Sequence, residues 1–343
     1  MKDMNKVLVT GGAGYIGSHT TIELIKKGYE VIIVDNFSNS EPSSLDRIKK
    51  ITRKDVPFIF GDLKDRNVIS KIFESFNDID TVIHFAAFKA VGESVAEPLK
   101  YYNNNILSLI NLLYSMKQYN VPNLIFSSSC TVYGQPDELP VTEDTPLKPA
   151  SSPYGNTKKI SEDIITDFIN SGNYIKSIIL RYFNPVGADI SGDNGELPQG
   201  IPNNLLPYIT QTALGIRECL NVYGNDYDTH DGTAIRDYIH VSDLANAHID
   251  SMRYLSNKSA PFCDIFNIGT GEGYSVLDVI NSINKFLDRP LPYKIVNRRP
   301  GDVEKIWADN TKAKNTLNWF PKFNLDDMTS SSLNWEKKFR GTL

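Results

Sequence analysis

The sequence has few cysteines and no long apolar run. Its three cysteines, Cys130, Cys219 and Cys263, lie far apart and form no Cys-x-x-Cys pair, which argues against a disulfide framework and a zinc site. No apolar segment approaches the length of a membrane span, and the residues before a predicted strand at Lys6 lack the apolar core of a signal peptide. We therefore expect a soluble, cytoplasmic protein without a metal ion.

An excess of positive charge is also missing. Lysine and arginine number 36 against 41 acidic residues, which gives a net charge of -5, and the basic residues are scattered among the acids. Without a basic stripe, a nucleic-acid partner is not expected. A length of 343 residues suffices for one large domain or two ordinary ones with a sizeable core.

The first half alternates short apolar runs with amphipathic stretches. The runs are rich in Val, Ile and Phe and cover residues 6–10, 30–35, 57–60, 81–86, 123–128 and 177–183. Continuous apolar strands between amphipathic helices predict an α/β fold with a doubly wound parallel sheet of the Rossmann type. From Asn184 on, Pro and Gly cluster and the elements become shorter, which predicts a smaller, mixed substrate domain over 184–343. We expect residues 1–183 to form the nucleotide-binding domain, with part of 237–265 packing back on it.

A glycine-rich segment, TGGAGYIG, follows the first predicted strand. Gly11, Gly14 and Gly17 stand at the turn into a helix, where glycine lets the backbone approach a pyrophosphate. Asp35 closes the second strand 18 residues after Gly17, where an acid would hold ribose hydroxyls. Because no arginine follows Asp35 in NFSNS, NAD is favoured over NADP. Asp62, after the third strand, is predicted to lie at the adenine, or else to cap a helix.

The segment ASSPYGNTKK contains Tyr154 and, four residues later, Lys158. On the helix predicted there, both side chains lie on one side. Ser129 ends the fifth strand, and ligands of open α/β sheets bind beyond the carboxyl ends of the strands. A nearby ammonium and an oxidised nicotinamide would lower a phenol pKa of about 10, so this trio can take a proton from an alcohol while NAD takes a hydride. The same spacing recurs at Tyr254 and Lys258, which follow no such strand and are predicted to be surface residues.

Motifs along nearly the whole chain resemble the extended short-chain dehydrogenase/reductase family, and within it most closely the UDP-glucose 4-epimerases. They are VTGGAGYIGSHT, DTVIHFAAFKAVGESV, FSSSCTVYG, SPYGNTKK, LRYFNPVGA, GIPNNLLPY, GNDYDTHDGTAIRDYIHVSDLA and RRPGDVEKIWAD. The resemblance implies reversible epimerisation at C4 of UDP-galactose and UDP-glucose, as in galactose metabolism. It further implies a 4-keto intermediate, tightly held NAD, and a homodimer through the helices near 98–119 and 154–171.

The resemblance also implies which residues contact each ligand. Those expected to bind the cofactor are Gly11, Gly14, Tyr15, Ile16, Gly17, Asp35, Asn36, Ser40, Asp62, Leu63, Phe85, Ala86, Lys89, Asn104, Tyr154, Lys158, Tyr182 and Phe183. Those expected to bind the UDP-sugar are Ser129, Tyr154, Asn184, Asn204, Asn221, Val222, Tyr223, Arg236, Arg299, Asp302 and Ile306. Arginine suits a diphosphate in any case, because it is a fixed bidentate donor.

The chain departs from the family pattern at two positions. Cys130 stands where members often have alanine, and we assign it no redox role. Ile306 stands where a tyrosine resembles the version that restricts the pocket, whereas a smaller residue leaves room for an N-acetyl group. Isoleucine is intermediate in size, so we predict measurable activity on the N-acetylated UDP-sugars UDP-GlcNAc and UDP-GalNAc.

Three other readings stay open. Nucleotide-sugar 4,6-dehydratases of the same family carry an Asp-Glu pair where this chain has Cys130 and Thr131, which disfavours elimination of water. Epimerases of UDP-linked uronic acids or pentoses remain possible, since one pocket residue can decide the substituent at C5. A dinucleotide-sensing regulator with the same fold characteristically lacks the tyrosine and lysine, so Tyr154 and Lys158 argue against it.

Overall fold

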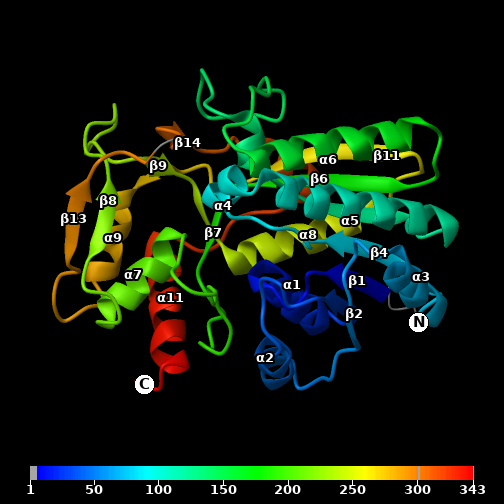
Figure 1. Cartoon of the computed structure of the whole chain (residues 1–343), viewed down its shortest axis with the longest axis horizontal. Helices are drawn as coiled ribbons and strands as arrows, with labels where there is room; N and C mark the ends of the chain where they lie inside the picture. The colour runs from blue at the N-terminus through cyan, green and yellow to red at the C-terminus, as the bar shows by residue number, and fades with distance from the viewer. Residues whose placement is uncertain (1–5, 300–301, 343) are drawn as a thin grey trace.

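A seven-stranded parallel sheet forms one part of the molecule in the computed structural model, which describes residues 6–299 and 302–342 (Figure 1). Its order is β11-β6-β5-β4-β1-β2-β3, so the chain starts inside the sheet and winds to both edges. The strands are β1 (Lys6–Thr10), β2 (Glu30–Asp35), β3 (Phe58–Phe60), β4 (Ile79–His84), β5 (Asn123–Ser129), β6 (Lys176–Tyr182) and β11 (Phe262–Ile268). The predicted doubly wound α/β class is confirmed.

Helices cover both faces of this sheet with apolar side chains. One hydrophobic cluster joins the sheet to α1 (Tyr15–Lys26), α2 (Ser43–Thr52), α8 (Val241–Ser256) and α10 (Thr311–Leu317). The cluster on the other face joins it to α3 (Arg66–Ser75), α5 (Pro98–Gln118) and α6 (Pro153–Asn170), and the short α4 (Val91–Ala96) lies against α5 and α6. Burial of these two clusters is the main force that holds the layers together.

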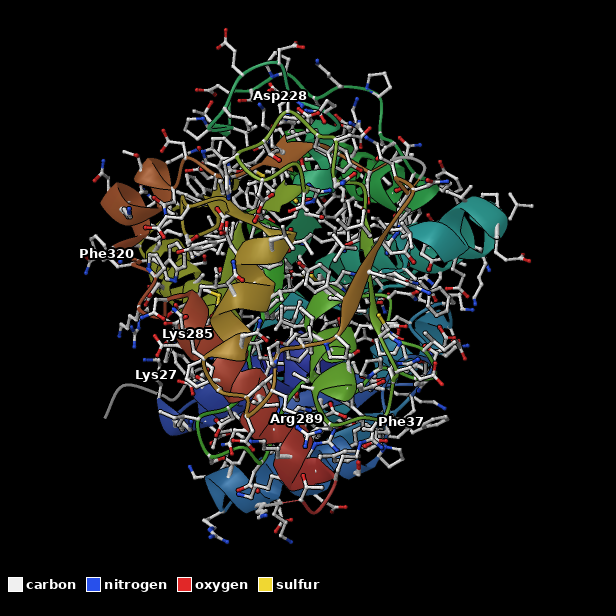
Figure 2. The ribbon with its side chains drawn as sticks, turned by 90° about the vertical axis from the view of Figure 1, so that its left-hand side faces the viewer. Lys27, Phe37, Asp228, Lys285, Arg289 and Phe320 are labelled. Atoms are coloured by element: carbon white, nitrogen blue, oxygen red, sulfur yellow. The ribbon has the colours of Figure 1, made fainter. Side chains whose placement is uncertain are left out.

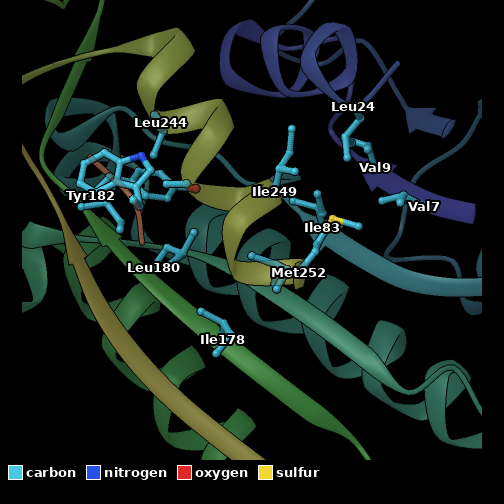
Figure 3. Close-up of a cluster of buried hydrophobic side chains, with 14 of the residues drawn as sticks. Val7, Val9, Leu24, Ile83, Ile178, Leu180, Tyr182, Leu244, Ile249 and Met252 are labelled. Atoms are coloured by element: carbon cyan, nitrogen blue, oxygen red, sulfur yellow. The ribbon is translucent and has the colours of Figure 1, made fainter. Parts of the chain in front are cut away.

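Part of the second half of the chain completes the first face. Figure 3 shows Leu244, Ile249 and Met252 of α8 beside side chains of the sheet such as Ile83 and Ile178. Some of residues 237–265 are predicted from the sequence to pack here. The structure places α8 and β11 here, so the added segment reaches Ile268, and it adds α10, which the sequence analysis did not foresee.

The remaining elements form a second, smaller part, on the left in Figure 1. They are β7 (Asn184–Val186), α7 (Leu205–Ala213), β8 (Leu220–Tyr223), β9 (Ile235–Arg236), β10 (Tyr238–His240), β12 (Tyr274–Ser275), α9 (Val276–Asn284), β13 (Tyr293–Val296), β14 (Lys305–Ile306) and α11 (Leu325–Phe339). A third cluster packs α7, α9 and α11 against β8. Figure 2 views this part face on, with Lys285 just beyond the end of α9, where it pairs with Asp326 of α11 at 2.8 Å. Among the residues described, no helix has the length and apolarity to cross a membrane.

The carboxyl ends of the central strands meet at one edge of the sheet. Thr10 pairs with His84, and Ser129 pairs with Tyr182, each at the last residue of its strand. A fourth hydrophobic cluster lies here and contains Phe183 from the turn after β6 and Ile306 of β14. The second part therefore meets the sheet at the edge where ligands of this fold class bind.

Candidate active site

The turn after β1 is shaped by its glycines. Gly11 has a left-handed φ of +69°, and a Cβ there would come within 2.8 Å of the Ala86 nitrogen in the turn after β4. A Cβ on Gly17 would lie 2.2 Å from the Gly11 oxygen, whereas one on Gly14 would meet only that oxygen, at 3.2 Å. Gly14 is the N-cap of α1, no side chain caps it, and the first turn has no acid. The amides at this helix start suit a dinucleotide pyrophosphate, and their role in binding it stays a prediction.

Asp35 is held in place by this turn and by its own loop. Its carboxylate accepts from the Ala13 amide at 3.1 Å, from the Phe37 amide at 2.9 Å and from Ser40 Oγ at 2.9 Å. A carboxylate fixed between the glycine turn and the end of β2 suits the adenosine ribose of NAD.

Asp62 does not cap a helix. Its Oδ1 accepts from the Lys64 amide at 2.9 Å and its Oδ2 from Asn36 Nδ2 at 3.2 Å. The cap of α3 is Asp65, whose carboxylate accepts from the Asn67 amide at 2.9 Å. The alternative reading of Asp62 as the helix cap is therefore wrong, because the helix starts three residues later than that reading required.

The predicted trio meets where α6 starts beside the end of β5. Tyr154 is the second residue of α6, and Lys158 follows one turn later with its Nζ 6.0 Å from the centre of the Tyr154 ring. Lys158 is buried and donates to the Ser127 carbonyl at 2.6 Å. Ser129 Oγ, at the last residue of β5, accepts from Thr131 Oγ1 at 3.0 Å and from the Thr131 amide at 3.2 Å.

Burial opposes the charged forms of both catalytic candidates. It raises the pKa of the Tyr154 phenol to about 12, against a hydrogen bond with Ser129 that lowers it. It lowers the pKa of the Lys158 ammonium to about 8, against the nearby Glu162 carboxylate, which raises it. Among the protein's own groups, loss of solvent around the phenol has the largest effect on the pKa of Tyr154, so this pKa lies above its usual value and not below it as expected.

The other residues predicted to bind the cofactor line the neighbouring strand ends. Phe85 follows β4 and packs on His248 with ring centres 4.7 Å apart, and Tyr182 packs on the same ring at 5.6 Å. Asn104 of α5 donates to Asn105 Oδ1 at 3.1 Å. Leu63 differs, because its side chain lies in the sheet's core and its carbonyl accepts from Asn111 at 3.1 Å. Its backbone amide is thus the group that can face a ligand.

Most of the predicted diphosphate and sugar residues lie in the second part, on β7, β8, β9 and β14 and in the loops beside them. Arg236 of β9 is paired in register with Ile306 of β14, and its guanidinium lies 3.8 Å from the Asp302 carboxylate. Ile306 itself is buried in the fourth cluster with Phe183 and Cys130. The side chain thus lies among apolar groups beside the strand end that carries Ser129.

Strand β8 presents its residues to opposite sides. The side chain of Val222 is buried in the core of the second part, so the prediction that it contacts substrate can hold for its backbone alone. Tyr223 points the other way and is 36% exposed, with the Arg299 guanidinium 4.5 Å from its ring centre. Asn221 shares that side of the strand, and its buried Oδ1 has no hydrogen-bond partner among the residues that the structure describes. An aromatic ring, an amide and a guanidinium together suit a nucleoside.

Glu196 is a residue of the site that the sequence analysis missed. Its Oε1 accepts from Lys89 Nζ at 3.0 Å and from Asn204 Nδ2 at 2.7 Å, so it joins a predicted cofactor residue to a predicted substrate residue. Trp335 Nε1 of α11 donates to its carbonyl at 3.1 Å. Asn184 lies nearby in sequence but is anchored elsewhere, its amide donating to the Asp237 carbonyl at 2.9 Å. Lys89 and Trp335 are far from Glu196 along the chain, although Asn204 is only 8 residues away, and no motif at Glu196 itself marks it.

Fold and site together define the class of this protein. A doubly wound sheet, a glycine turn with a ribose-type acid, and a serine, tyrosine and lysine at the carboxyl ends of the strands are the parts of an extended short-chain dehydrogenase/reductase.

Comparisons with known proteins identify the branch of this class. Residues 8–331 match the family described as GDP-mannose 4,6 dehydratase. The UDP-glucose 4-epimerase of Bacillus subtilis is 49% identical over 96% of each chain. The structure of UDP-glucose 4-epimerase from Bifidobacterium longum, in complex with NAD+ and UDP, has a TM-score of 0.94 and 49% identity over 99% of this chain and 100% of that one. The enzyme from Stenotrophomonas maltophila, with NAD and formylated UDP-arabinopyranose, has a TM-score of 0.95 and 43% identity over 99% of this chain and 100% of its own.

The chain belongs to the UDP-glucose 4-epimerase family. The predicted family is thereby confirmed, and the NAD in both of these related structures agrees with the predicted cofactor.

Proposed function

We propose that this protein interconverts UDP-galactose and UDP-glucose by epimerisation at C4. The observation that carries the proposal is the packing of α6 against the end of β5. Tyr154, Lys158 and Ser129 lie together there. Bound NAD supplies a hydride acceptor that returns the hydride in the same turnover. The rest of the reaction consists of binding, orientation and movement of one proton.

Tyr154 takes the proton from the C4 hydroxyl. After the 4-keto sugar has turned to present its opposite face to the returning hydride, Tyr154 gives the proton back to the C4 oxygen. Ser129 orients the hydroxyl, since its own Oγ is fixed by two donors from Thr131. Lys158 supplies the positive charge that favours the phenolate against the effect of burial. Arg236, Arg299 and the exposed ring of Tyr223 hold the UDP, so that the sugar can turn while it stays bound.

The two parts of the molecule are assigned to different ligands. We assign NAD to residues 1–183 together with α8, β11 and α10, whose cores are continuous with the sheet, and the UDP-sugar to the rest of residues 184–343. The turn after β6, with Phe183 and Asn184, lies between the two.

A proton NMR time course of the purified protein with UDP-galactose tests the proposal. The sugar signals are expected to convert toward those of UDP-glucose without added cofactor if NAD is retained in purification, and with added NAD otherwise. Unchanged signals in both conditions, in protein shown to be folded and to bind NAD, would overturn the proposal. The same experiment with UDP-linked pentoses and uronic acids then decides which sister activity replaces it.

The proposed range of sugars includes N-acetylated ones. Ile306 is smaller than tyrosine, and its neighbours Phe183 and Cys130 are apolar, which supports room for the methyl group of an acetamido substituent. Turnover of UDP-GlcNAc is expected to be measurable and lower than that of UDP-galactose. Undetectable turnover beside robust conversion of UDP-galactose would refute this extension.

We also propose a homodimer through α4, α5 and α6. Along α4 and the start of α5, apolar side chains four residues apart are exposed, namely Val91 at 47%, Val95 at 62% and Leu99 at 81%. An apolar stripe of this kind is typical of an interface. Sedimentation at assay concentration is expected to give twice the chain mass, and Leu99→Lys is expected to shift the protein toward monomer. A monomeric wild type would contradict the proposal.

A further inference from the structure

Three side chains of α6, each one turn from the next, face three consecutive serines of β5. Lys158 donates to the Ser127 carbonyl at 2.6 Å, and Ser128 Oγ donates to Glu162 Oε1. The hydroxyl of Ser129 is the group that lowers the pKa of Tyr154 against the effect of burial. Glu162 is therefore the third member of a row whose other two members form the proposed catalytic pair.

Glu162 is tied down by a second buried charge. Arg181 of β6 donates from Nε to Oε1 at 3.0 Å and from Nη2 to Oε2 at 2.6 Å, and the two side chains are 5% and 4% exposed. Nη1 of Arg181 donates to Tyr133 Oη at 3.0 Å, and Tyr133 donates to Asn267 Oδ1 at 2.6 Å. The Glu162 carboxylate thus accepts from three donors, and two of them are the Nε and Nη2 of one arginine in fork geometry. Such a carboxylate is held in one position and stays negatively charged.

Few other charges act on Lys158. On its own helix, Tyr154 is neutral and Glu162 is the nearby anion. From β4 it faces His84, which burial keeps uncharged by lowering its pKa to about 3. From β5 it faces the ring of Phe126, with Nζ 5.1 Å from the ring centre. From β6 the nearby charge is that of Arg181, which Glu162 neutralises.

We propose that Glu162, held by Arg181, is a positioning residue that fixes α6 on β5 and keeps Lys158 a charged ammonium beside Tyr154. The inference rests on the proposed function for its catalytic readout. The physical reason is that burial lowers the pKa of the Lys158 ammonium, and the neighbouring Glu162 carboxylate raises it again. It extends the site from Tyr154 and Lys158 to a third residue on the same helix face.

The test is the pH dependence of turnover in Glu162→Gln. The basic limb of kcat is expected to move to lower pH by about one unit, because an ammonium without its neighbouring anion loses its proton more easily. KM for UDP-galactose at neutral pH is expected to stay near the wild-type value, since Glu162 touches no substrate group. Asp163→Asn is the matched control, because Asp163 is the next residue on α6, is exposed and loses the same charge.

A double variant separates charge from folding. Glu162→Gln leaves the Arg181 guanidinium buried without its partner, which is expected to destabilise the protein. Glu162→Gln combined with Arg181→Met removes both charges and is expected to recover stability while the basic limb stays below that of wild type. If the basic limb of the kcat profile lies at the wild-type pH in both variants, the Glu162–Arg181 pair has only a structural role and the proposal is overturned.

A second readout does not depend on activity. The rate at which acetic anhydride labels Lys158, measured by peptide mass spectrometry across pH, follows the fraction of neutral amine. Its midpoint is expected near pH 8 in the wild type and lower in Glu162→Gln. If the wild type proves inactive on UDP-sugars but this midpoint moves, the proposed function fails and the inference stands. If the wild type is active but the midpoint is unmoved, the inference fails alone.

Discussion

In the proposed reaction, the phenol of Tyr154 has to lose a proton in surroundings that favour keeping it. Burial raises its pKa to about 12, and the hydroxyl of Ser129 works against this. The Nζ of Lys158 lies 6.0 Å from the centre of the ring. A proton transfer at neutral pH therefore depends on the short distances within this trio. At Tyr254 the same tyrosine-lysine spacing has no serine strand beside it, and Lys258 lies over the ring at 4.2 Å. Tyr254 is partly buried against the sheet's core, which corrects its prediction as a surface residue.

Tyr154→Phe is expected to lower kcat by about 10²- to 10⁴-fold, because it removes the group that exchanges the proton. NAD content after purification should match the wild type, since Asp35 and the glycine turn are untouched. Tyr254→Phe deletes the same oxygen from the similarly spaced pair and is expected to keep full activity. Comparable kcat values for the two variants would return Tyr154 to the role of an ordinary helix residue.

Among the helices and strands, the turn between β3 and α3 contains two aspartates whose hydrogen-bond partners differ. Asp62 precedes α3, and its two oxygens bond to Lys64 and Asn36, the residue that follows the ribose-type Asp35. Asp65 caps α3 through the Asn67 amide. Of these two aspartates, Asp65 caps the helix because α3 begins at Arg66, and Asp62 is left for its proposed place at the adenine.

Asp65→Ala is expected to lower the free energy of unfolding by about 1 kcal/mol through loss of the cap, without changing NAD affinity. Asp62→Ala is expected to weaken NAD binding several-fold while the unfolding midpoint stays within error. Guanidinium unfolding and calorimetric titration of NAD into cofactor-free protein measure the two effects. A loss of stability in Asp62→Ala together with a loss of NAD affinity in Asp65→Ala would contradict these assignments.

At the scale of the whole molecule, the protein buries histidines in their neutral form. Burial lowers the pKa of His84 to about 3, of His240 to about 3 and of His248 to about 4. Each side chain joins elements that are distant in sequence; His84, for instance, bonds to Thr10 Oγ1 at 2.8 Å across β1 and β4. Folding therefore depends on pH through these residues.

Stability is expected to be full above about pH 6.5 and to fall as the pH drops toward 4, because the unfolded chain then binds protons that the folded histidines exclude. The loss at pH 5 is about 2 kcal/mol for each of these histidines. Asp237 partly offsets it, since burial raises its pKa to about 6 and the folded state gains a proton there. Guanidinium midpoints at pH 7.5 and pH 5 measure the difference, and an equal or higher midpoint at pH 5 would contradict it.

Features that depend on neighbours along the chain can be predicted from the sequence. The strands at 6–10 and 30–35 lie where their apolar runs predicted, and Tyr154 and Lys158 share a helix face because four residues make about one turn. The glycine turn follows equally, since it needs only a strand, a tight turn and a helix. Local periodicity carries all of this information.

Only the tertiary structure decided what depends on partners far apart in sequence. It placed α10 on the sheet, turned the side chains of Leu63 and Val222 into cores, and brought Glu196 to Lys89 and Asn204. Glu162 belongs to this group as well. Its spacing from Lys158 is visible in the sequence, but its charge acquires a task only when β6 brings Arg181 beside it. Burial and pairing are properties of the packed molecule, and no local pattern encodes them.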